Sequence, residues 1–473
     1  MKLSVSFSLI LLCFLTSAYA STINAASCST TDVQTAINSA ANGDTVNVPS
    51  GVCTWGSQIT IPKTKGVLLQ GAGIGVTVIT DSYAADSTLL ITVQSGNAVN
   101  RVTGFTFIAT ASKPGSVIEV HANGDCDSCF RVDHNLFDQV IHRSVIVSAQ
   151  GHLFSGLLDH NTINKSTSSV VQGFSIYGAV ACSDGSSGDP CNDPFSFPIQ
   201  LGTSRNVFIE DNTFNFTGSY PDGAMDNYGG SRVVFRHNTI IGTYFGNHGA
   251  DSGPYRGQHT FEFYDNTFTN SNAAIFIPIF LRSGTGMIFN NTITGNYNGG
   301  DHSIELSNYR SCTSYSPWGK CDGTSAWDEN QTGATGYACL DQAGHVFTHN
   351  QGGSNQLVPL YAWKNTLNGA EKDTKPDGSA CNENTAHNQA DRDYYNYTAT
   401  FDGTSGVGQG LLSARPASCT PLTAYFATDT NTLYQCASPN TWTTYYAPYT
   451  YPHPLQSGDP PPAPPTDLNA VVQ

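Results

Sequence analysis

The stretch that decides the fold is VVFRHNTIIG at Val233–Gly242. Its pattern recurs, with different residues at most positions, as FEFYDNTFTN at Phe261–Asn270. In both copies apolar residues alternate with other residues, and an Asn-Thr pair follows the alternating run. An apolar residue at every second position predicts a β-strand, because successive side chains of a strand point to opposite faces. Each copy therefore predicts a strand that ends at an asparagine.

The same pattern recurs along the middle of the chain. The successive asparagines are 26, 51, 26, 28 and 25 residues apart, and we interpret the interval of 51 as two periods. A nearly fixed period predicts stacked repeats, and the strand-like alternation excludes the helical repeat classes. The prediction is a parallel β-solenoid with coils about 4.8 Å apart. We expect the repeated asparagines to be structural and to form a ladder: Asn135, Asn161, Asn212, Asn238, Asn266 and Asn291.

A helix is predicted in front of the first coil. Thr31–Gln34 has the form of a capping box, which marks a helix start. The apolar residues that follow are spaced to lie on one face of this helix. Such a helix would cover the open end of the solenoid, whose unpaired strands would otherwise invite aggregation. The residues on that face are Val33, Ala36, Ile37 and Ala40.

The start of the chain also resembles a known group. TDVQTAINSAANGDTVNVPSGVCTW from Thr31, ITIPKTKGVLLQGAG from Ile59 and TVIT from Thr77 are similar to the pectate-lyase-like right-handed parallel β-helix superfamily. The repeats extend this resemblance to about residue 310. The resemblance implies the right-handed coil. It implies no single reaction, because the superfamily includes lyases, hydrolases, esterases and non-enzymatic surface proteins.

The expected architecture is therefore all-β: a right-handed parallel β-helix with an N-terminal capping helix and an irregular, disulfide-bearing C-terminal flap. We assign residues 1–20 to a signal peptide, 21–370 to the solenoid, 371–457 to the flap and 458–473 to a Pro-rich tail. HVFTHNQG from His345 and YAWKNTL from Tyr361 are interpreted as the last coils. The aromatic stretch WTTYYAPYTYPHPL is assigned to the flap, with a sugar-stacking surface as the alternative.

The N-terminus and the cysteines both predict export. Residues 1–20 contain a lone Lys2, an apolar core and a small-residue cleavage site, as a secretory signal does. Without Cys13, twelve cysteines remain, an even number that is typical of disulfides in an oxidising compartment. Proximity in sequence suggests the pairs Cys28–Cys53, Cys126–Cys129, Cys182–Cys191, Cys312–Cys321, Cys339–Cys381 and Cys419–Cys436. We expect a secreted protein, extracellular or periplasmic.

The low content of charged residues and the negative net charge restrict which molecules the protein is expected to bind. Only 12% of the residues are charged and the net charge is −16, so the basic surface that nucleic acid requires is not expected. We predict no membrane span and a monomer. One strand column of a solenoid forms a flat face with loop walls, and this open groove suits a polysaccharide. Because the net charge repels a polyuronate, a local arginine cluster or Ca²⁺ would have to offset it unless the substrate is neutral.

The candidate site lies where one coil departs from the repeat. Alignment on the asparagines puts Gln200 in the same phase as Asp226, and it puts Asn247 and His248 on the coil beside Asp226. That coil carries the insertion ADSGPYRGQ at Ala250–Gln258. Polar residues from this and later coils give the candidate catalytic set Asp226, His248, Arg256, Arg282 and Glu305, and the candidate substrate-binding set Gln200, Tyr228, Asn247, Tyr255 and His302.

These residue types suit β-elimination from a uronate polymer. A base must remove the proton on the carbon beside the carboxylate, and a cation must stabilise the charge that develops. We assign His248 as the base and Arg256 and Arg282 as the carboxylate neutralisers. Asp226 would orient His248 or bind Ca²⁺, the one cofactor that this chemistry suggests.

Two other functions remain open at this level. A glycoside hydrolase needs two carboxylates flanking the bond, and Asp226 with Asp251 or Glu305 has the right chemistry. A non-catalytic glycan-binding or surface solenoid needs only the groove. The residues also have a purely structural interpretation, in which Asp and Arg on adjacent coils pair at the surface. The leading hypothesis is a polysaccharide lyase.

Overall fold

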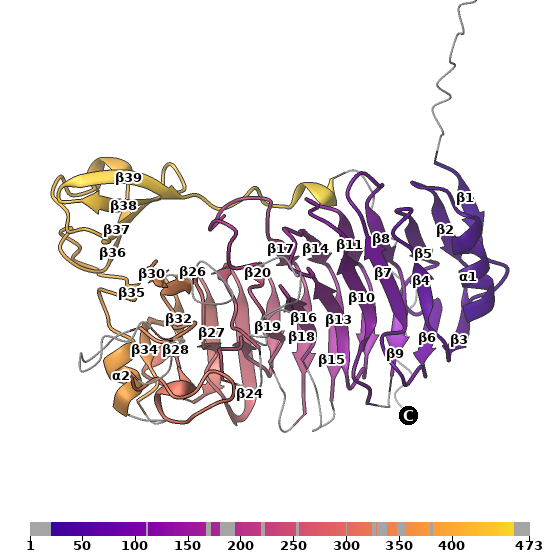
Figure 1. Ribbon diagram of the computed structural model, residues 1–473, viewed down its shortest axis with the longest axis horizontal. Coiled ribbons are helices and arrows are strands. Elements are labelled where there is room, and N and C mark those ends of the chain that lie inside the picture. Colours follow the sequence, from indigo (N-terminus) through magenta and orange to yellow (C-terminus); the bar gives the residue numbers. More distant parts are fainter. Residues whose placement is uncertain are drawn as a thin grey trace, which may run out of the picture.

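The computed structural model describes residues 20–109, 112–166, 172–179, 194–218, 223–251, 255–298, 300–323, 328, 338–347, 355–378 and 382–457. The signal segment, apart from Ala20, and the Pro-rich tail lie outside these residues. The chain is a right-handed parallel β-helix, whose strands stack along the long axis of the molecule (Figure 1). The predicted fold class is confirmed. A helix able to cross a membrane is not found in the described part.

Three strand columns build the solenoid. The first face has twelve strands, paired in parallel from one coil to the next. It consists of β1 (Thr22–Asn24), β2 (Thr45–Val48), β5 (Leu68–Gly71), β8 (Asn100–Thr103), β11 (Phe130–Asp133), β14 (Gly156–Asp159), β17 (Val207–Glu210), β20 (Arg232–Arg236), β23 (Thr260–Tyr264), β26 (Thr285–Phe289), β31 (Leu360–Trp363) and β35 (Tyr394–Asn396).

The second face has eleven strands, of which the last pairs antiparallel. It consists of β3 (Gly51–Trp55), β6 (Thr77–Asp81), β9 (Thr106–Ile108), β12 (Leu136–Asp138), β15 (Thr162–Lys165), β18 (Thr213–Phe216), β21 (Thr239–Ile241), β24 (Thr267–Ile275), β27 (Thr292–Tyr297), β32 (Thr366–Leu367) and β33 (Ala370–Glu371).

The third face is divided into two sheets. Six strands form its N-terminal part: β4 (Ile59–Ile61), β7 (Leu89–Val93), β10 (Ser116–Ala122), β13 (Arg143–Ser148), β16 (Phe174–Tyr177) and β19 (Met225–Tyr228). Four continue it: β22 (Phe245–Gly246), β25 (Ile279–Leu281), β28 (His302–Leu306) and β34 (Asp373–Pro376). The His248 amide donates to the Asn227 carbonyl at 3.0 Å, so the two sheets meet beside β19.

The interior is filled by side chains that repeat from coil to coil. On the second face Phe107, Phe137, Ile163 and Phe214 occupy one column of the register and are buried. Burying a side chain of this size contributes about 1.5–3 kcal/mol. The N-terminal end of this core is covered by α1 (Thr30–Ser39), as expected, although the helix is capped by Ser29, ahead of the predicted box.

The predicted asparagine ladder is confirmed and has one more member, Asn365. The amide nitrogens of Asn135, Asn161, Asn212 and Asn238 each donate to two backbone carbonyls, and those of Asn266, Asn291 and Asn365 each donate to one. From Asn161 onward, each amide oxygen accepts from the asparagine of the preceding coil. Asn238, for example, donates to Ile209 and Arg236 at 2.9 Å and accepts from the Asn212 backbone at 3.0 Å. The residue before each predicted ladder asparagine has a positive φ, between 50° and 59°, which His, Asp and Asn tolerate. This explains why His, Asp or Asn precedes each of these asparagines in the sequence.

The interval of 51 residues is one coil, and its interpretation as two periods is wrong. The Asn161 amide donates directly to the Asn212 side chain at 2.9 Å, and β14 pairs with β17. The extra residues lie between β16 and β17. The stretch Phe197–Thr203 therefore forms no strand, and Asp226 is paired with Ser175 rather than stacked against Gln200.

The solenoid also continues past residue 370, because β34 and β35 pair with strands of its third and first faces. YAWKNTL does form a final coil, through β31 and Asn365. HVFTHNQG does not: β29 (His345–Phe347) pairs antiparallel with β30 (Asn355–Leu357). A short helix, α2 (Asn382–His387), precedes β35.

The C-terminal segment is more regular than expected. It forms a four-stranded sheet of β36 (Val407–Gly410), β37 (Ala424–Ala427), β38 (Thr432–Ser438) and β39 (Thr441–Tyr446), which lies at the end of the solenoid remote from α1 (Figure 1). Residues 447–457, which we call the C-terminal strap, return along the outside of the first face. The Arg236 guanidinium donates to the Tyr449 carbonyl at 2.6 Å, and the Glu210 carboxylate accepts from the His453 amide at 2.8 Å.

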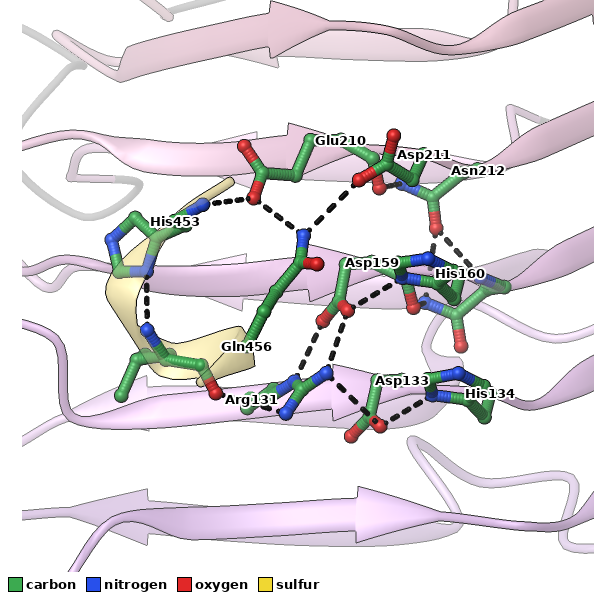
Figure 2. Close-up of polar contacts among 12 residues, drawn as sticks. Arg131, Asp133, His134, Asp159, His160, Glu210, Asp211, Asn212, His453 and Gln456 are labelled. Carbon is green, nitrogen blue, oxygen red and sulfur yellow. Dashed lines mark hydrogen bonds and ion pairs between the residues drawn. The ribbon is translucent and has the colours of Figure 1, made fainter. Parts of the chain in front are cut away.

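Figure 2 shows how the strap is held. The Gln456 amide contacts Glu210 and Asp211, while Arg131 donates to the Leu455 carbonyl and pairs with Asp159. These contacts, with the apolar cluster beneath β37–β39, attach the C-terminal segment to the solenoid. Tyr446 is buried there, so it is part of this packing rather than of a sugar-stacking surface.

Three predicted disulfides are confirmed: Cys28–Cys53, Cys126–Cys129 and Cys419–Cys436. Two predicted pairs are wrong, because Cys321 bonds Cys339 instead of Cys312. Cys339 is thereby also removed from the predicted pair with Cys381. Proximity in sequence failed here because the segment beyond the last regular coil folds back on itself. The pair Cys182–Cys191 lies outside the described residues.

We expect the asparagine ladder to contribute to the free energy of unfolding of the protein. Asn238→Ala removes an amide that is 1% exposed, together with its hydrogen bonds to two carbonyls and to the Asn212 amide. Each such loss costs about 1–3 kcal/mol, so we expect the free energy of unfolding to fall by about 3 kcal/mol or more in urea titrations. Asn272→Ala, at an exposed amide outside the ladder, is the control. Equal stability of the two variants would contradict the structural role.

Glu262 should make stability depend on pH. Burial raises the pKa of Glu262 to about 7, although hydrogen bonds from the Gly202 amide and the Tyr446 hydroxyl partly oppose this. The unfolded chain loses this proton near 4.5, so stability falls by about 3 kcal/mol as the pH rises from 4.5 to 7. Glu262→Gln should therefore gain stability relative to the natural protein over that range in thermal unfolding. Exposed Glu371→Gln should not, and a pH-independent difference for Glu262→Gln would disprove the assignment.

Candidate functional site

A pocket of about 430 Å³ opens on the third face, where β19 meets β22. Met225 of β19 points into the core, so the strand alternation turns Asp226 outward. The next two coils contribute residues that directly follow β22 and β25. The pocket is lined by Gln172, Met225, Asp226, Tyr244, Gly246, Asn247, His248, Phe276, Phe280, Arg282 and Tyr309.

His248 lies between two carboxylates. Its Nε2 is 3.0 Å from Asp226 Oδ2, and its Nδ1 is 3.9 Å from Asp251 Oδ1. The imidazole is 22% exposed, which is enough for a ligand in the pocket to reach it. Burial lowers the pKa of His248, but the hydrogen bond to Asp226 and the nearby Asp251 carboxylate outweigh burial, so the pKa lies above its usual value of 6.5.

Arg282 is held beside this histidine. Its Nε donates to the Asn247 carbonyl at 2.7 Å, and its backbone amide donates to Asn247 Oδ1 at 2.7 Å. Its Nη1 pairs with Asp251 Oδ1 at 3.0 Å. Within the described part of the chain its Nη2 has no partner, and the side chain is 15% exposed. The guanidinium is therefore fixed in place while one edge can donate to a ligand.

Aromatic side chains form the walls of the pocket. Phe276 is 37% exposed, and its ring packs against Tyr244 and Phe280. Phe280 and Tyr309 both lie near the Arg282 guanidinium, with ring centres 5.9 and 5.7 Å away. Such rings present flat apolar surfaces on which the C–H face of a sugar can stack.

A second pocket of about 530 Å³ adjoins the first and shares Phe276 and Tyr309 with it. Here His302 lies between Asp301 Oδ1 at 2.7 Å and Glu305 Oε2 at 3.2 Å. Lys375 pairs with Asp301 at 2.6 Å. The remaining lining residues are Ile277, Asn298, Pro376, Asp377 and Gly378.

The structure thus brings Asp226, Asn247, His248 and Arg282 together in the first pocket. It places Glu305 and His302 in the second. The two pockets lie side by side because they are built on neighbouring coils. In these coils β22, β25, β28 and β34 pair in order, with register partners Gly246, Phe280, Glu305 and Lys375. Four predicted residues therefore share one pocket, and two belong to its neighbour.

Four predicted residues lie elsewhere. Arg256 is fully buried, forms a two-bond ion pair with Asp341 at 2.6 and 2.8 Å, and does not line the pocket. Tyr228 and Tyr255 pack against each other at 5.0 Å beside the pocket, and the Tyr228 ring makes an edge contact with His248. Gln200 lies in the excursion between β16 and β17, away from Asp226.

Several pocket residues were not predicted. Phe276 reaches the rim because the pairing of β24 with β27 shifts between Asn270 and Ile275, which pushes the following loop outward. The strand lengths that accompany this shift, nine residues in β24 against three in β21, come from the structure, and the ordinary 25-residue spacing of Asn266 and Asn291 gave no signal of it. Tyr309 and Lys375 come from segments after the last regular repeat, where the period of the sequence gives no position.

Calcium was the one cofactor suggested by the sequence. Asp226 and Asp251 contact opposite ring nitrogens of His248, so they orient the imidazole and do not converge on one ion. Groups of ligand atoms close enough for a metal occur elsewhere in the described residues. One contains the disulfide-bonded Cys321 and Cys339, and in the other the carboxylates are already paired with Arg101 and Arg131. We derive no step through Ca²⁺.

No protein-family model matches the chain, and no curated protein sequence matches it. Among solved structures, an alginate lyase from Paenibacillus sp. str. FPU-7 is 14% identical, with a TM-score of 0.32 over 60% of this chain and 99% of its own. The catalytic domain of a GH87 α-1,3-glucanase in complex with nigerose is 11% identical, with a TM-score of 0.33 over 79% and 67%. Likenesses at this level transfer no residue and no activity. Membership of the pectate-lyase-like superfamily stays a prediction.

The pairing of His248 with Asp226 can be measured. In Asp226→Asn the imidazole loses an anionic partner that raises its pKa, so the pKa of His248 should fall. An NMR titration of the histidine ring protons follows this shift directly. Asp301→Asn, which changes a carboxylate in the second pocket, should leave the His248 titration in place. An unchanged His248 pKa in Asp226→Asn would show that the two groups do not interact in solution.

Proposed function

We propose that this chain is a secreted polysaccharide lyase that cleaves a uronate-containing polymer by β-elimination. The proposal rests on one observation: His248 and Arg282 open into the same pocket, each held by its own carboxylate. A base oriented by an anion beside a fixed cation is the arrangement that proton abstraction next to a carboxylate requires. Secretion is supported by the N-terminal sequence and by four described disulfides.

The residues divide the reaction between them. The substrate carboxylate accepts from Arg282 Nη2, which stabilises the negative charge as the neighbouring C–H proton is removed. His248 takes that proton, the electron pair of the C–H bond forms a double bond, and the glycosidic C–O bond breaks. The imidazolium then returns the proton to the departing oxygen, so the elimination consumes no water. Asp226 keeps the imidazole aimed and stabilises its charged form.

The aromatic walls position the sugar. Phe276 and Tyr309 separate the two pockets and give the polymer apolar surfaces on both sides of the cleavage point. The pocket also addresses the acidic net charge of the chain, because Arg282 offers a local cation where the substrate carboxylate would lie. On this proposal, Arg282 supplies the positive charge that the reaction needs, and no extended basic surface is required.

A glycoside hydrolase is the main alternative. Asp226 and Asp251 contact opposite sides of the imidazole, and two carboxylates in one site are what a hydrolase requires. The Asp251 side chain is only 2% exposed, however, and it is engaged by Arg282. Its role in holding Arg282 favours the lyase, and a glycan-binding protein without activity is the third outcome of the test.

The test is incubation with uronate and neutral polysaccharides. A lyase produces the ultraviolet absorbance of an unsaturated uronide, a hydrolase produces reducing ends without it, and a binding protein retains polymer uncut. We expect the first result, with an acidic limb of the pH–rate profile above 6.5 because the base must be neutral. His248→Ala should lower kcat by about 10²–10⁴-fold.

Arg282→Ala should lower kcat/KM for the same polymer, since the carboxylate loses its partner. Arg205→Ala, at an arginine outside both pockets whose side chain is 40% exposed, is the matched control and should retain full activity. Elimination that survives in His248→Ala would remove this histidine as the base. Reducing ends without the unsaturated product would replace the lyase with the hydrolase.

A further inference from the structure

We propose that Arg143 binds a second carboxylate of the same polymer, on the side of the cleavage point that faces the N-terminal coils. Arg143 was not among the residues predicted from the sequence. The inference rests on the proposed function for the chemical class of the polymer. It adds that the groove holds at least two uronates of one chain, each at its own guanidinium.

Arg143 reaches the same outer face that carries the first pocket. Phe174 and Ile176 of β16 point into the core, so the strand alternation turns Ser175 outward. The Arg143 Nε donates to Ser175 Oγ at 3.1 Å, and Ser175 is the register partner of Asp226 on the next coil. Neighbouring coils are about 4.8 Å apart, so the guanidinium is bonded to the coil directly beside the catalytic carboxylate.

The first pocket extends onto this coil. Gln172, which comes two residues before β16, lines the pocket together with His248. Arg143 belongs to β13, two coils before β19, while Arg282 directly follows β25 on the other side. The two arginines therefore lie on opposite sides of His248 along the stack. A polymer that fills the pocket and continues toward the N-terminal coils reaches Arg143.

The Arg143 guanidinium keeps donors for a ligand. Its Nη1 lies 3.5 Å from the Pro114 carbonyl, its Nη2 has no partner among the described residues, and within that part of the chain it pairs with no carboxylate. Glu119 of the preceding coil accepts from the Ser87 hydroxyl and pairs with His121 at 2.5 Å. Because Arg143 is partly exposed, its planar fork can donate to a carboxylate that approaches from the groove.

A second cation also answers the charge of the chain. The net charge of −16 opposes the approach of a polyuronate, and Arg282 shares its own charge with Asp251. Arg143 adds attraction at another sugar of the same polymer. Since this sugar is remote from the C–H bond that breaks, the contact is equally strong before and during the reaction. Such a contact lowers KM and leaves kcat unchanged.

The experiment compares the natural protein with Arg143→Ala on polygalacturonate, polyglucuronate and polymannuronate. For the polymer that is cleaved, we expect KM to rise about tenfold and kcat to stay nearly constant, because one charge-assisted contact is lost. The rise in KM should shrink between about 0.01 and 1 M NaCl, since salt screens a partly exposed ion pair. Arg205→Ala, outside the groove, should leave KM unaltered.

A second variant separates the charge from the fold. Arg143→Gln keeps a side-chain amide that can bond Ser175, and it should raise KM as Arg143→Ala does. A natural KM in either variant would overturn the inference. So would a rise in KM that is the same at every salt concentration, because that result would indicate a disturbed coil and not a lost ion pair.

Failure of the proposed reaction is distinguishable. If no polymer is cleaved, calorimetry with uncut oligomers of the same three uronates tests Arg143 by itself. Weaker binding by Arg143→Ala than by the natural protein, with no difference between them for neutral galactose oligomers, would support the inference and remove only the lyase reaction. Equal affinity of the two proteins for the uronates, or no binding of any of them, would overturn the inference as well.

Discussion

The hydrogen-bond register between coils is the constraint on which this structure depends. Parallel strands leave no freedom for one coil to slide past the next, because a shift of one residue would turn the core side chains outward. The asparagine ladder fixes that register at one corner of every coil from Asn135 to Asn365, since each asparagine bonds at least one backbone carbonyl and the asparagine of the neighbouring coil. Excursions elsewhere in a coil then leave the stack intact. The long one between β16 and β17 is accommodated in this way, with Asn161 bonded to Asn212 across it.

The fixed register also brings residues that are distant in the sequence into contact at the candidate site. Asp226 and His248 are 3.0 Å apart because their strands are neighbours on the third face, not because they are close in the chain. The insertion after His248 then brings Asp251 back to hold Arg282 from the following coil. A rigid stack holds such groups in place without rearrangement during the reaction, which is what electrostatic stabilisation of a developing charge requires.

Many cations of the chain are committed to anions of the chain itself. Arg236 pairs with Glu210 under the strap, Arg256 pairs with Asp341, and Lys375 pairs with Asp301. The buried pairs among them contribute position more than net stability, because desolvation offsets much of their attraction. Arg282 also pairs with an anion, Asp251, but its Nη2 has no partner among the described residues.

The sequence alone determined the solenoid, its period, its capping helix and the placement of Asp226 and His248 on adjacent coils, because local alternation and a fixed repeat set register directly. It misjudged Gln200, because one coil with an excursion has the length of two coils. It could not show that Arg256 is buried against Asp341, since that partner lies beyond the last repeat. Phe276, Tyr309 and Lys375 were likewise decided only by the tertiary structure. Their segments obey no period, and only packing against the finished stack brings them to the groove.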